Sequence, residues 1–229
     1  MTTPDIQPAE LRRLDETPPL RDRIYQQLEA MITSGAFTPG SRLVESELAQ
    51  TLGVSRGPIR EALQLLWRDG FVDLRPRQGA FVHVPTHKEI DDFFDIRRAL
   101  EIESVRLASL RVTPEVATDL RASIDRACDL LKRGEDPSDV QRLVNLHEAL
   151  TAAADNPLLA QMLRALDKRA VWYRSPFDPT WRQRSWDEHD TIVNAVIARD
   201  AEGAVSAMAA HIDGARQHLH ESAQPAPTK

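Results

Sequence analysis

Three histidines in the second half of the chain, His147, His189 and His211, each share the apolar stripe of a predicted helix. A neutral imidazole nitrogen is a good ligand for Zn²⁺ or Ni²⁺, and three such nitrogens leave coordination positions open for water or a carboxylate. The pattern therefore predicts a divalent metal site to which three helices each supply one imidazole. A single histidine on an apolar face is more often a hydrogen-bonded core residue, and that alternative stays open for each of the three.

Two arginines, Arg56 and Arg60, are four residues apart and share one face of a helix predicted from about Arg56 to Asp69. The planar guanidinium fits the O6 and N7 atoms of guanine, and a helix fits the major groove of DNA. Ser55 is a predicted N-cap, and the helix N-terminus can bind a backbone phosphate. The pattern predicts a helix that contacts DNA bases, while the alternative is that both arginines are ordinary solvated charges.

The elements around this helix are typical of a winged helix-turn-helix. A first helix is predicted to end at Gly35, a second spans 46–52, and a sharp turn at Gly53 leads into the arginine-bearing helix. Segment 71–84 carries two apolar runs around an Arg-Pro-Arg-Gln-Gly centre, which predicts a β-hairpin.

The hairpin would form the wing. Arg75 and Arg77 bracket a proline near its tip, and Gly79 allows close approach of the backbone to a ligand. Such a wing could enter the minor groove or hold phosphates.

Everything from residue 88 onward has helical periodicity, so the predicted fold class is mainly α, with a small β-hairpin in the first domain and a helical bundle in the second. The predicted domain organisation is a flexible tail over 1–17, a winged helix-turn-helix over 18–86, an all-helical domain over 87–221, and a flexible tail over 222–229.

Composition narrows the classes of function. The chain has 229 residues, one cysteine and a formal net charge of −6, and it has no apolar run long enough to span a membrane. These features predict a cytoplasmic protein without internal disulfides or membrane contact. The acidic total argues against general polyanion binding, but five arginines against three acids between Arg56 and Arg77 give the predicted head a local basic excess.

The run FTPGSRLVESELAQTLGVSRGPIREALQLLWRDGFVDLRPRQGAFV closely resembles the DNA-binding head of the GntR family of bacterial transcription regulators. The resemblance implies that Arg56 and Arg60 contact bases, that Ser55 and Gly57 lie beside the DNA backbone, that Arg42 and Ser46 flank the scaffold helix, and that the wing lies near Arg77 and Gly79. Relatives often carry Arg where this chain has Ser46.

Three later segments, FFDIRRALEIESVRLAS, HEALTAAADNPLLAQML and EHDTIVNAVIARDAEGAVSAMAAHI, resemble the all-helical FCD effector-binding domain of the FadR subfamily. In many such domains three histidines, and an aspartate four residues before the first, hold a divalent metal beside a small carboxylate effector. Leu143 stands at the position of that aspartate in this chain.

A buried arginine on the first of these helices needs an anionic partner. The resemblance implies that Arg97, or otherwise Arg98, binds the effector carboxylate. The alternative is an ion pair between Arg97 and Glu101 within the same helix, which contributes little if it is exposed.

Together these observations predict a homodimeric transcription regulator, more specifically a repressor, that is not an enzyme. It would bind an inverted repeat in double-stranded DNA, and its affinity would be controlled by a small organic acid and a divalent metal. Two alternatives stay open: a metal-dependent hydrolase with a DNA-binding head, although the sequence has no HExxH motif, and a sensor of metal alone.

Overall fold

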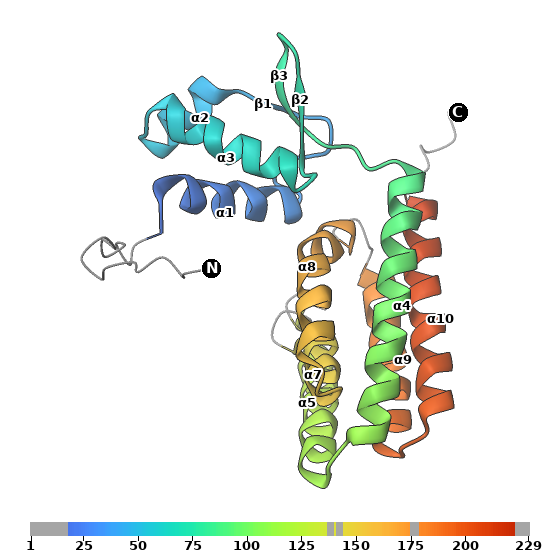
Figure 1. The fold of residues 1–229 in the computed structure, drawn as a ribbon. Helices are drawn as coiled ribbons and strands as arrows, with labels where there is room; N and C mark the ends of the chain where they lie inside the picture. Colours follow the sequence, from blue (N-terminus) through green and yellow to red (C-terminus); the bar gives the residue numbers. More distant parts are fainter. Residues whose placement is uncertain (1–17, 137–139, 141–143, 175–178, 223–229) are drawn as a thin grey trace, which may run out of the picture. The chain divides into compact units, whose positions relative to one another are not determined.

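The computed structural model describes residues 18–136, 140, 144–174 and 179–222. The fold is mainly helical with one small sheet, as predicted, and the chain divides into two compact units between Val84 and Pro85, close to the predicted boundary after residue 86 (Figure 1). The predicted tails lie outside the described residues, except that Ser222 ends the last helix.

The first unit packs three helices against a three-stranded sheet. Its elements are α1 (Leu20–Thr33), β1 (Arg42–Leu43), α2 (Glu45–Leu52), α3 (Arg56–Arg68), β2 (Val72–Arg75) and β3 (Gly79–Val82). The apolar stripe of α3 is fully buried, and α1 packs against this helix with its own buried stripe; the residues are Ile59, Leu63 and Leu66 on α3, and Ile24, Leu28 and Ile32 on α1. This packing leaves the opposite face of α3 in solvent.

A glycine sets the angle between α2 and α3. Gly53 ends α2 with φ 65 and ψ 35, in the left-handed region that an L side chain rarely adopts. Two residues later Ser55 is in extended backbone and α3 begins at Arg56. The predicted helix, turn and helix are confirmed here.

The sheet has one strand more than the predicted hairpin. Its order is β1-β3-β2, all antiparallel, with Arg42 opposite Phe81 and Leu43 opposite Ala80. Strand β1 has two residues only, too few for an alternating pattern to reveal it from sequence.

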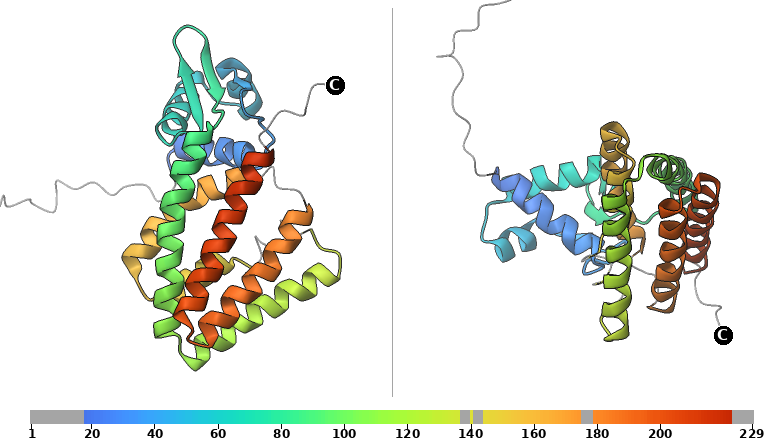
Figure 2. Two further views of the ribbon diagram at one scale, coloured as in Figure 1. Left: turned by 90° about the vertical axis from the view of Figure 1, so that its right-hand side faces the viewer. Right: turned by 90° about the horizontal axis from the view of Figure 1, so that it is seen from below.

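The second unit is a helical bundle built around a long central helix. Its described helices are α4 (His87–Arg111), α5 (Pro114–Lys132), α7 (Leu146–Ala153), α8 (Pro157–Arg174), α9 (Pro179–Ile197) and α10 (Ala201–Ser222). Helix α4 contacts α7, α8, α9 and α10. Figure 2 shows α4, α9 and α10 side by side.

Short local sequence signals mark where these helices begin. Thr86 and Glu89 form a capping box at α4, and Thr113 caps α5, which begins at Pro114. Asn156 accepts a hydrogen bond from the Leu159 amide at the start of α8, which is the contact of a capping residue.

Candidate nucleic-acid interface and ligand site

Both arginines predicted to contact bases lie exposed on the first two turns of α3, opposite its buried stripe. Gly57 lies between them in the chain, and open space surrounds the position that a Cβ would take there. Ser55 occupies the N-cap position, but its side chain makes no capping hydrogen bond. The start of α3 thus presents guanidinium groups, a hydroxyl and bare backbone on one exposed surface.

Arg60 has a partner that sequence analysis did not find. Its Nε donates to Oε2 of Glu45, the first residue of α2, at 2.6 Å, and both side chains are exposed to solvent. No ion pair of Arg56 occurs within the described part of the chain. The Glu45 carboxylate therefore orients one of the two arginines and leaves the other unrestrained.

The wing residues differ in how firmly they are held. The Arg75 guanidinium lies 4.3 Å from the centre of the Phe81 ring, a cation–π contact that keeps it on the hairpin. Arg77 lies in the turn with φ 63, and Gly79 follows with φ 102. A Cβ at Gly79 would lie 3.8 Å from Nε of Arg42, so the strand β1 arginine is beside the wing.

Ser46, the remaining residue of the predicted DNA-binding set, is exposed in the first turn of α2.

The three histidines of the predicted metal site come together in the second unit. His147 of α7, His189 of α9 and His211 of α10 each offer a ligand atom, and these atoms all lie within 4.8 Å of one another. The Nε2 atoms of His189 and His211 are 3.3 Å apart. Two nitrogens bound to a tetrahedral Zn²⁺ are also about 3.3 Å apart, so the His189–His211 pair has a spacing compatible with a shared metal. Nε2 of His147 lies 3.5 Å from Nη2 of Arg97.

Two carboxylates orient these imidazoles from outside the cluster. Nδ1 of His147 lies 2.6 Å from Oε2 of Glu101, and Nδ1 of His211 lies 2.8 Å from Oε2 of Glu188. A ring that donates through Nδ1 carries its lone pair on Nε2, the arrangement found in histidines that bind metals. The sequence predicts a partner for Glu101 only in Arg97 and gives no signal for Glu188, although Glu188 directly precedes His189.

The Arg97–Glu101 pair, one of the two alternatives for Arg97, forms in the interior. Nε of Arg97 donates to Oε1 of Glu101 at 2.8 Å, and both side chains are almost fully buried. Burial by itself would raise the pKa of Glu101, but the hydrogen bond from His147 and the permanent charge of Arg97 hold that pKa well below its usual range. Arg97 therefore has an internal anionic partner, and a role in binding an effector stays a prediction.

Burial lowers the pKa of His147 to about 4, an effect that the neighbouring Glu101 carboxylate partly offsets. The imidazole is therefore neutral near pH 7 and available as a ligand.

Arg98 lies at the surface, where its Nε donates to Asp213 of α10 at 3.1 Å. Leu143, at the position of the aspartate in metal-binding relatives, lies outside the described residues.

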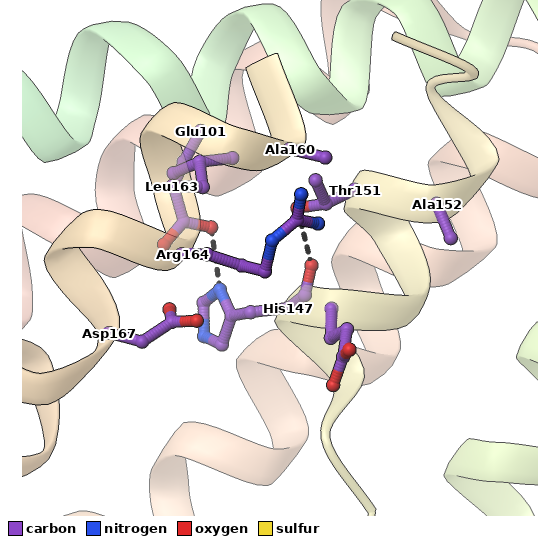
Figure 3. Close-up of a pocket in the computed structure, with 9 residues that line it drawn as sticks. Glu101, His147, Thr151, Ala152, Ala160, Leu163, Arg164 and Asp167 are labelled. Atoms are coloured by element: carbon purple, nitrogen blue, oxygen red, sulfur yellow. Dashed lines mark hydrogen bonds and ion pairs between the residues drawn. The ribbon is translucent and has the colours of Figure 1, made fainter. Parts of the chain in front are cut away.

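A pocket of about 110 Å³ adjoins His147 between α4, α7 and α8 (Figure 3). Its polar lining comes from each of these helices: Glu101, His147, Glu148, Thr151, Arg164 and Asp167. Arg164 forms no ion pair with any residue that the structure describes. The sequence gives no signal for Arg164, because an arginine among the exposed residues of α8 has the pattern of a solvated charge.

Comparison with known proteins assigns both units. Residues 20–82 match the model described as bacterial regulatory proteins, gntR family, and residues 92–214, more than half of the chain, match the FCD domain. The chain belongs to the GntR family of regulators with an FCD domain. It is therefore a DNA-binding transcription regulator, as the residues of α3 and of the wing predicted.

Relatives that match this GntR-family chain over most of their length are named as transcription regulators. It is 31% identical to the uncharacterized HTH-type transcriptional regulator YdhC of Bacillus subtilis, over 90% of this chain and 94% of that one. It is 30% identical to the transcriptional repressor GlaR of Escherichia coli, over 82% and 90%.

Among solved structures, a putative GntR regulator from Rhodococcus has the same fold, with a TM-score of 0.73 at 23% identity, over 89% of this chain and 99% of that one. None of the described helices is both long and apolar enough to cross a membrane.

Proposed function

We propose that this GntR-family regulator is a repressor whose affinity for its operator is set by a small organic acid bound next to a divalent metal in the FCD domain. The observation that carries the proposal is the convergence of His147, His189 and His211 beside a pocket that contains a guanidinium group. The family supplies the DNA-binding role, and relatives named as repressors, among them GlaR, support the direction of regulation.

At the DNA, Arg56 and Arg60 would contact base edges in the major groove. Ser55 and Gly57 would lie against phosphates at the start of α3, and Arg42 and Ser46 would flank them. The wing, through Arg75, Arg77 and Gly79, would fix the register on the backbone or in the minor groove. A homodimer would present two such heads to an inverted repeat.

In the FCD domain, neutral imidazoles of the three histidines would hold Zn²⁺ or Ni²⁺, and Glu101 and Glu188 would fix their orientation. The residues present fit such a metal, since one ligand atom from each ring lies within 4.8 Å of the other two, and Glu101 and Glu188 can accept the Nδ1 protons of His147 and His211. The metal would supply a positive charge and open coordination positions for an effector carboxylate.

For the effector, Arg164 is the better partner than the predicted Arg97 or Arg98. Arg97 is matched by Glu101 and Arg98 by Asp213, whereas Arg164 lines the pocket without an ion pair among the described residues. Binding would change operator affinity only as far as the effector and metal prefer one arrangement of the domains over another.

The test is a chemical analysis of what the purified protein carries. Elemental analysis and mass spectrometry of released ligand should find a divalent metal and an organic acid in the wild-type protein, and His189→Ala should lose the metal while still binding operator DNA. Wild-type protein that binds operator but neither retains nor takes up Zn²⁺ or Ni²⁺ would contradict the proposed metal. DNA release by metal alone would instead indicate a metal sensor.

We also propose that the chain has no catalytic activity. Glu148, the acid next to His147, lines the pocket, but its Oε2 accepts a hydrogen bond from Asn145 at 2.9 Å. Turnover of esters, lactones or amides that follows the metal content would overturn this view in favour of a hydrolase.

A further inference from the structure

The guanidinium of Arg97 lies against the three-histidine cluster as well as against Glu101. Its Nη2 is 3.5 Å from Nε2 of His147, while its Nε donates to Oε1 of Glu101 at 2.8 Å. Helix α4, which carries Arg97, packs against α7, which carries His147. A guanidinium stays protonated in proteins, so the cluster has a permanent cation at its edge.

Two contacts fix the tautomer of His147. The ionised Glu101 carboxylate only accepts hydrogen bonds, so Nδ1 of His147, 2.6 Å from Oε2 of Glu101, carries the proton. A guanidinium only donates, so Nε2 of His147 carries the lone pair where it meets Arg97. The nitrogen that His147 can offer to a metal ion is therefore the one that Arg97 contacts.

The ligands themselves bring no negative charge that would offset this cation. Among the residues that the structure describes, the group that could hold an ion consists of three imidazoles, and Glu101, behind His147, is already matched by Arg97. An ion bound about 2.0 Å from Nε2 of His147 would lie within about 5.5 Å of Nη2 of Arg97. Arg97 is only 3% exposed, so salt screens the repulsion weakly.

We propose that Arg97 makes binding of the divalent ion depend on a bound carboxylate, so that the ion and the organic acid bind cooperatively. This coupling presupposes the metal and the acid of the proposed function. With the ion alone, the charge of Arg97 opposes binding. A carboxylate beside the ion offsets the repulsion, and by linkage the ion raises the affinity for the acid by the same factor. The regulator then responds to the two ligands jointly.

The experiment is a calorimetric titration of the metal-free full chain with Zn²⁺, in sodium acetate and in sodium chloride of equal ionic strength. Acetate is the probe carboxylate. The wild-type protein should bind Zn²⁺ about 10-fold more tightly in acetate than in chloride. Acetate also complexes free Zn²⁺ weakly, which lowers the apparent affinity, so the expected gain cannot arise in solution.

Arg97→Met removes the charge at the cluster. It should bind Zn²⁺ about 10-fold more tightly than the wild-type protein in chloride, and its affinities in acetate and chloride should be nearly equal. Arg98→Met is the matched control, because it removes the same charge from the next residue of α4, which lies at the surface and pairs with Asp213. It should behave as the wild type does. Arg97→Gln is a second neutral variant for the case that Arg97→Met does not fold.

The outcomes separate this coupling from the metal site on which it depends. Equal Zn²⁺ affinities of the wild-type protein in acetate and chloride would overturn the coupling and leave the metal site standing. A gain in Arg98→Met as large as that in Arg97→Met would also overturn it, since any positive charge on α4 would then have the same effect. Wild-type protein that binds no Zn²⁺ in either salt would overturn the proposed metal and the coupling together.

Discussion

At the scale of single residues, Arg56 and Arg60 share a face of α3 but differ in what restrains them. If Arg56 or Arg60 contacts a base edge, its replacement by alanine should weaken operator binding by about 1–3 kcal/mol. The base preference should also relax at the position that the arginine contacts. Quantitative gel shifts against single-base operator variants measure both effects. Arg68→Ala, at the other end of α3, is the control and should leave base preference unchanged.

The Glu45 carboxylate makes a separate prediction. Glu45→Gln releases Arg60 and removes a negative charge near the phosphates, so affinity for non-specific DNA should rise while the ratio of specific to non-specific binding falls several-fold. Glu47→Gln removes the same charge from the same helix without freeing Arg60. If the two variants lose discrimination equally, Glu45 contributes charge alone and does not position Arg60.

Burial of His147 predicts a dependence of stability on pH. Its pKa falls from 6.5 to about 4 on folding, so from pH 6.5 downward the unfolded chain binds a proton that the folded chain does not. The free energy of unfolding of metal-free protein should therefore fall as the pH is lowered, by about 2 kcal/mol from this group between about pH 7.5 and about pH 5.

Urea unfolding of the wild-type protein and of His147→Gln at both pH values measures this contribution. Glu101 contributes almost no pH dependence of stability between these two pH values. Its pKa is lowered in the folded protein, so the stability that its ionisation provides is lost only below the usual pKa of a glutamate. Equal pH dependence in the two proteins would contradict the buried, neutral state of His147.

At the scale of elements, the two glycines around the start of α3 should respond in opposite ways to alanine. Gly53→Ala places a Cβ on left-handed backbone and should cost about 1–2 kcal/mol of stability, although open space surrounds it. Gly57 is helical, so Gly57→Ala should stabilise the head by up to about 1 kcal/mol while weakening operator binding, because the new methyl group meets the DNA backbone.

Chemical denaturation and gel shifts of both variants are the measurements. A Gly57→Ala protein that binds the operator as tightly as the wild type would remove Gly57 from the DNA-contacting surface.

Local sequence signals were sufficient for most elements. Periodic apolar residues, Gly53, Thr113–Pro114 and Asn156 each act within a few residues of themselves, so α1, α3, α5 and α8 could be predicted from the sequence. Strand β1 could not, because it exists only through its pairing with β3.

The same distinction separates the predicted from the missed site residues. The helical spacing of the apolar residues was enough to predict that the three histidines lie on the inward faces of their helices. The partners Glu45, Glu188 and Arg164 depend on which helices pack together, and a single sequence does not contain that information. The contact between His147 and Glu101 shows this limit most clearly, because it exists only through the packing of α7 against α4.

At the scale of the whole molecule, a bound metal should stabilise the FCD domain more than the DNA-binding head. Zn²⁺ or Ni²⁺ at 100 times its Kd would stabilise the folded domain by about 2.7 kcal/mol. Calorimetry of metal-free and metal-loaded protein should show a rise in the Tm of the helical domain that His189→Ala abolishes. Equal shifts in the wild-type protein and the variant would mean that the metal binds elsewhere.

The distribution of the three imidazoles over α7, α9 and α10 has a consequence for how the protein is made. A growing chain on the ribosome that has folded only as far as α9 possesses two of them, and the third arrives with α10. If the three imidazoles hold a metal, as proposed above, the complete set of ligands exists only after α10 has been translated.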